Sequence, residues 1–188
     1  MQKEFTIEDL RNLAERAISN VSFELHWKIW FELAQTEERF SNFDLSRKAY
    51  SKAVSLSNSS QHWKVFMRAS RTELLDGQIE NAKRLLERSF SEAPPKMKYL
   101  TLLESSKLFE FCQDFPAAER ILEKAKKESS GEWKVFLAMV MLQLRNSNQK
   151  KALIQIEQAL KIHSTTGRLW VNHFLKFLFF INLSIQKK

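Results

Sequence analysis

The stretch WKVFMRASRTELLDGQIENAKRLLERSF, residues 63–90, decides the fold, because it holds two amphipathic segments that meet at Asp76-Gly77. Apolar and small residues recur at helical spacing from about residue 63 to 75 and again from about 79 to 89. Glycine readily takes the left-handed conformation that ends a helix, so a break at Gly77 is expected. The stretch therefore predicts a helical hairpin.

The outline of this hairpin returns along the chain with a period of about 36 residues. Aromatic residues open successive units at spacings of 36, 36, 34 and 37, at Trp27, Trp63, Tyr99, Trp133 and Trp170. Small residues follow 19 positions later, at Ser46, Ala82, Ala118 and Ala152, and seven positions beyond those, at Ala53, Ser89, Ala125 and Ala159. Such periodicity predicts an all-α, right-handed α-α superhelix of about four helix-turn-helix repeats plus half repeats at both ends.

The predicted repeats divide a single helical-repeat domain over residues 1–188. We expect a half repeat at 5–20, repeats at 24–57, 61–93, 96–129 and 131–163, and an incomplete repeat at 168–185. The last of these contains an apolar run from Phe174 to Ile185, which is shorter than the roughly 20 residues needed to cross a bilayer. We therefore predict no membrane segment, and expect this helix to meet a neighbouring repeat, a partner or a second copy of the chain.

The composition excludes several classes of site. Only three glycines, three prolines and one cysteine are present, which favours helices and excludes a disulfide framework or a cysteine-based zinc site. Cys112 lies among phenylalanines and is expected to be buried. The N-terminus lacks the apolar core of a signal peptide, which fits the cytosol or the nucleus. We find no phosphate loop, nucleophile elbow or paired metal-ligand motif, and so predict no catalytic residue, no metal, no cofactor and no enzyme activity.

The net charge of +8 lies entirely in the second half of the sequence. Residues 1–94 carry 14 basic and 14 acidic side chains, whereas residues 95–188 carry 16 basic and 8 acidic ones. An asymmetry of this kind can mark an acidic partner, including nucleic acid. Direct RNA contact by the basic half, through residues such as Lys124, Lys126, Lys127, Lys134, Lys150 and Lys151, is therefore one alternative; a solvated basic face is the other.

The repeated unit resembles the HAT repeat (half-a-tetratricopeptide), a variant of the tetratricopeptide family, over residues 7–170. Its first helix opens with tryptophan, carries an aromatic residue three positions on and has a glutamate near its end. Its second helix ends in an ERA-like segment. The matching residues are Trp27, Trp63, Trp133 and Trp170; Trp30, Phe66 and Phe136; Glu37 and Glu73; and Glu15-Arg16-Ala17, Glu87-Arg88-Ser89 and Glu123-Lys124-Ala125.

Some positions depart from this pattern. The third unit has Tyr99 in place of tryptophan and Phe109 in place of glutamate, and the fourth has Gln143 at the glutamate position. HAT-like and generic tetratricopeptide-like repeats therefore both stay open. The HAT resemblance implies a nuclear scaffold that binds other proteins of an RNA-processing complex, in splicing, 3′-end formation or ribosomal RNA maturation. A generic cytosolic adaptor unrelated to RNA is the alternative.

A partner-binding groove, by tetratricopeptide geometry, would be lined by residues that follow each opening aromatic on the first helix. These residues are Lys28, Phe31, Lys64, Met67, Arg71, Lys134 and Leu137. The recurring Trp-Lys pair would form a basic row with apolar gaps, which suits an extended acidic peptide. The alternative is that these lysines lay their methylene stems on apolar surface and keep their ammonium groups in water.

Overall fold

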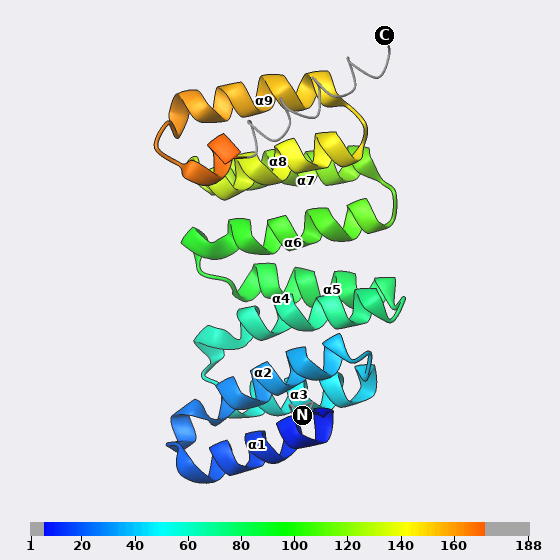
Figure 1. Ribbon diagram of the computed structural model, residues 1–188, viewed down its shortest axis with the longest axis vertical. Helices are drawn as coiled ribbons and strands as arrows, with labels where there is room; N and C mark the ends of the chain where they lie inside the picture. The colour runs from blue at the N-terminus through cyan, green and yellow to red at the C-terminus, as the bar shows by residue number, and fades with distance from the viewer. Residues whose placement is uncertain (1–5, 172–188) are drawn as a thin grey trace, which may run out of the picture. The chain divides into compact units, whose positions relative to one another are not determined.

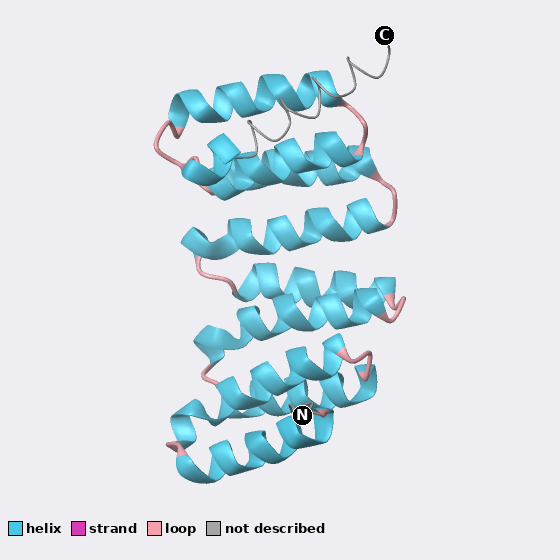
Figure 2. Ribbon diagram, viewed as in Figure 1, coloured by secondary structure: helices cyan, strands magenta, loops and turns pink. Residues whose placement is uncertain are grey.

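The computed structural model describes residues 6–171, and all secondary structure within that range is helical (Figures 1 and 2). The all-α prediction is confirmed. The chain divides into two compact units, Met1–Pro94 and Pro95–Lys188. The expectation of one domain over residues 1–188 stays a prediction.

The first unit consists of one helix followed by two helical hairpins. Its helices are α1 (Ile7–Asn20), α2 (His26–Arg39), α3 (Phe43–Leu56), α4 (Ser59–Leu75) and α5 (Ile79–Glu92), with a 3₁₀ turn at Phe23–Leu25. The most extensive contacts join α2 to α3 and α4 to α5, and further contacts join α1 to α2 and α3 to α4. Short turns make each pair antiparallel (Figure 1).

The second unit repeats the hairpin twice. A 3₁₀ turn at Pro95–Met97 leads into α6 (Lys98–Phe111), which pairs with α7 (Phe115–Glu128), and α8 (Trp133–Arg145) pairs with α9 (Gln149–Ile162). Residues 167–171 are helical again. The remainder of the predicted incomplete repeat at 168–185, with its apolar run, lies outside the described residues, as does residue 5 of the predicted half repeat.

All four hairpins use the same turn. Gly77 has a left-handed φ of 76°, and the aligned residues Ser41, Gln113 and Ser147 have φ of 59°, 61° and 57°. In each turn the next amide donates to the carbonyl five residues earlier, at 2.8–2.9 Å. This is the Schellman pattern, which satisfies carbonyls at the end of a helix. The turn predicted from Gly77 therefore occurs in all four hairpins, and the other three hairpins have a polar residue at the left-handed position.

The predicted small positions are buried in every repeat. Each of the eight residues, Ser46, Ala82, Ala118, Ala152, Ala53, Ser89, Ala125 and Ala159, is at most 1% exposed. The two serines satisfy their hydroxyls on the facing helix: Ser46 Oγ donates to the Ala34 carbonyl at 2.9 Å, and Ser89 Oγ donates to the Trp63 carbonyl at 2.8 Å. Small side chains therefore let the two helices of a hairpin approach closely.

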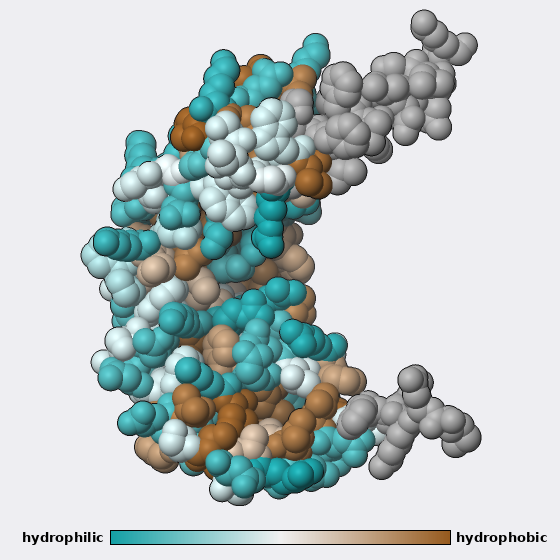
Figure 3. All heavy atoms as spheres, turned by 60° about the vertical axis from the view of Figure 1, so that its left-hand side comes forward, coloured by the Kyte–Doolittle hydropathy of each residue, from teal (hydrophilic) through white to brown (hydrophobic). Residues whose placement is uncertain are grey.

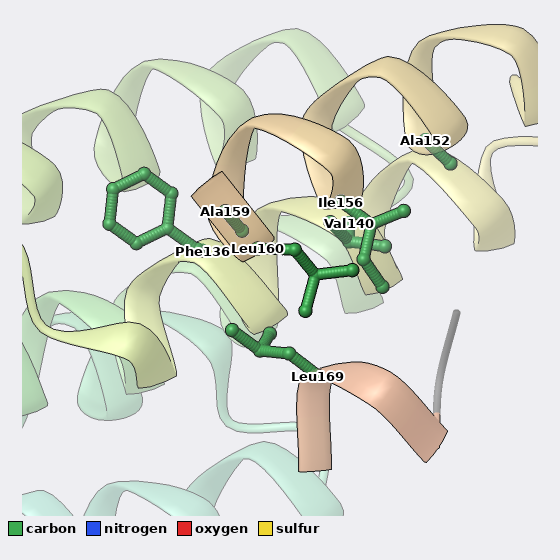
Figure 4. Close-up of a cluster of buried hydrophobic side chains, with 7 residues drawn as sticks. All are labelled: Phe136, Val140, Ala152, Ile156, Ala159, Leu160 and Leu169. Atoms are coloured by element: carbon green, nitrogen blue, oxygen red, sulfur yellow. The ribbon is translucent and has the colours of Figure 1, made fainter. Parts of the chain in front are cut away.

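The opening aromatics differ in burial. Trp63 and Tyr99 are buried, Trp27 and Trp133 are half-buried, and Trp170 is about half exposed. The last hairpin has its own apolar cluster, in which Leu169 packs against α8 and α9 (Figure 4). The members of this cluster are Phe136, Val140, Ala152, Ile156, Ala159, Leu160 and Leu169.

Candidate protein-interaction surface

The three lysines predicted to line a groove are all exposed. Lys28 lies on α2, Lys64 on α4 and Lys134 on α8. The Lys28 Nζ lies 5.9 Å from the centroid of the Trp27 ring, and the Lys64 Nζ lies 5.6 Å from that of Trp63. Ammonium groups at this distance are attracted to the ring face. The two Trp-Lys pairs of the first unit therefore each present an ammonium group beside an aromatic side chain.

The three apolar residues of the predicted groove are half-buried, and two of them contribute to cores. The Phe31 ring meets the Tyr50 ring edge-on, with centroids 5.9 Å apart. Leu137 packs against the cluster between α8 and α9. Met67 is half-buried on α4. Whether these side chains also contact a partner stays a prediction.

Arg71, the remaining groove candidate, takes part in an ion pair between helices. Its Nε lies 3.3 Å from Oε1 of Glu38, whose side chain is only 5% exposed. The other oxygen of Glu38 accepts a hydrogen bond from Thr72 Oγ1 at 2.7 Å. Two residues of α4 thus satisfy a buried carboxylate of α2, so Arg71 has a structural role whether or not it also meets a partner.

Glu37 is a second buried carboxylate in the first unit, and the sequence did not reveal its burial. Arg11 donates to both of its oxygens, from Nε at 2.7 Å and from Nη2 at 2.9 Å, and also bonds Glu8 at 3.0 Å. Asn42 Nδ2 adds a bond to Glu37 at 2.8 Å. Hydrogen bonds from Arg11 and then Asn42 lower the pKa of Glu37 against the opposing effect of burial. The pair fastens α1 to the end of α2.

The same arrangement recurs 36 residues later. Arg47 donates to both oxygens of Glu73, at 2.8 and 3.2 Å, bonds Asp44 at 3.0 Å, and also pairs with Asp76. It fastens α3 to the end of α4. The sequence signal was an arginine followed 26 positions later by glutamate, repeated at the period of the hairpins. Phe109 replaces the glutamate in the next repeat, so the pattern stops there in the sequence.

Several cations of the basic second half contact neighbouring helices of their own unit. Lys126 Nζ lies 5.4 Å from the Phe136 ring centroid. Lys151 forms an ion pair with Glu119. Arg145 Nη2 donates to Glu110 Oε2 at 2.8 Å. These contacts join α7 to α8, α9 to α7, and α8 to α6, so part of the positive charge stabilises packing.

The expectation that Cys112 is buried is wrong. Its side chain is exposed, beside an exposed Phe111. Cys112 caps the C-terminus of α6, where the chain leaves the helix through the left-handed Gln113. The neighbouring Phe111, which is itself exposed, therefore does not enclose the thiol.

No helix among residues 6–171 combines the length and the apolar character that a bilayer crossing requires. The same residues contain no grouping of three histidine, cysteine, aspartate or glutamate side chains that could hold a metal ion.

Comparison with known proteins relates the sequence to one family and one larger protein. The family model described as PRP6, TPR-like domain matches residues 1–180. A TPR-containing protein of Dictyostelium discoideum is 63% identical over 164 residues. That match covers 87% of this chain but only 13% of the relative, so the chain spans a small part of the relative's length.

Solved structures with the same fold share little sequence with the chain. BtubC (BKLC) from P. vanneervenii superposes with a TM-score of 0.64 at 12% identity, covering 91% of this chain and 78% of that one. MamA from residue 41 onward, from Desulfovibrio magneticus RS-1, gives a TM-score of 0.54 at 13% identity, covering 85% and 96%. These likenesses and the family model together confirm an all-α, tetratricopeptide-like fold.

Proposed function

The chain belongs to the family of the PRP6 TPR-like domain, and on this premise we propose that it is a non-enzymatic, protein-binding scaffold of a nuclear RNA-processing complex. The family model covers nearly the whole chain, and repeats of this type generally mediate contacts between proteins. Pre-mRNA splicing is the processing step that the family favours. The Dictyostelium relative is similar in sequence and adds nothing further to this proposal.

The proposal rests on the contacts that the polar side chains of the first unit make. The buried carboxylates Glu37 and Glu73 are each held by an arginine from the preceding helix, which leaves them no part in chemistry. What repeats on the surface is a lysine beside a tryptophan, at Lys28 and Lys64. An exposed cation beside an aromatic ring suits an acidic segment of another protein. Recognition rather than catalysis is therefore the function that the side chains support.

The experiment is affinity purification of the full chain from its native source, after nuclease treatment, with mass spectrometry of the proteins that accompany it. We expect proteins of one RNA-processing complex. Recovery of only chaperones or trafficking proteins would overturn the proposal. A variant with Lys28→Glu and Lys64→Glu should lose acidic partners, whereas Lys52→Glu, an exposed lysine on α3 outside the predicted groove, is the matched control for charge.

A further inference from the structure

We draw no further inference here: the strongest candidate, the groove of about 320 Å³ between α1 and α2, at the level where Figure 3 shows apolar side chains gathered, is an apolar face of the first unit, and nothing in the structure shows what covers it.

Discussion

Replacement of Ser41 by glycine is expected to stabilise the protein, because Ser41 holds a left-handed φ of 59° at the end of α2. A residue with a side chain costs roughly 1–2 kcal/mol in this conformation. Glycine avoids that strain, but gives the unfolded chain extra freedom worth about 0.4–1 kcal/mol. The difference leaves a gain of about 0.5–1 kcal/mol. The same gain is expected for Gln113→Gly and Ser147→Gly.

The reverse change has an internal control in the same chain. A Cβ added at Gly77 meets no atom within 4 Å, so Gly77→Ala should cost only the backbone strain less the entropy gain, again about 0.5–1 kcal/mol. A Cβ at Gly167 also meets nothing within 4 Å, but its φ lies outside the left-handed range. Gly167→Ala should therefore stabilise the protein by about 0.4–1 kcal/mol. One chemical change thus has opposite signs at two sites.

Urea unfolding followed by circular dichroism measures these differences, with the slope of the transition checked for each variant. Each of the three glycine substitutions should move the midpoint upward and leave the slope unchanged. Destabilisation by Ser41→Gly, or an equal response of Gly77 and Gly167 to alanine, would refute the reasoning from backbone conformation.

Three further predictions concern the charged residues of the first unit. Arg47→Met should lower the free energy of unfolding by about 2–3 kcal/mol in urea titrations, because it leaves the Glu73 carboxylate buried without its cation; a loss under about 0.5 kcal/mol would contradict this. Hydrogen bonds from Arg11 lower the pKa of Glu37 and therefore stabilise the fold at pH values above the ordinary pKa of glutamate. This stabilisation is lost as the pH falls through the lowered pKa. Glu37→Gln should therefore flatten the curve of stability against pH below about pH 5. Lys64→Glu should change thermal stability by less than about 0.5 kcal/mol, whereas reversing Arg71 sets two carboxylates together and should destabilise the protein in the same melts.

The architecture was predictable because its signals are spaced regularly. Large aromatics and small residues recur at one period, and the small ones are buried since a bulky side chain would separate the two helices of a hairpin. The position of a left-handed residue was visible at Gly77 alone. Ser41, Gln113 and Ser147 share its conformation because the hydrogen bonds of the turn and the packing of the hairpin impose it, and single-residue preferences do not reveal that.

The candidate surface was less predictable, because sequence position does not show what a charge will meet. That Arg71 faces a partner stays a prediction, and the sequence did not reveal that it also pairs with Glu38 of the neighbouring hairpin. Glu37 and Glu73 were identified only as a repeated position near the end of the first helix, yet both are buried and each bonds an arginine 26 positions earlier. These contacts join helices of successive repeats, and only the three-dimensional register shows them.

The central claim is that this chain binds proteins directly, and it is tested by how partner binding depends on salt and on ribonuclease. Partners captured on the immobilised full chain would be measured as salt rises from about 50 to about 200 mM, with and without the nuclease. A protein scaffold predicts that the same partners stay bound under all these conditions. Release by ribonuclease, or a loss of affinity of about 10³–10⁵-fold over that range, is the behaviour of a contact through nucleic acid and would contradict the account.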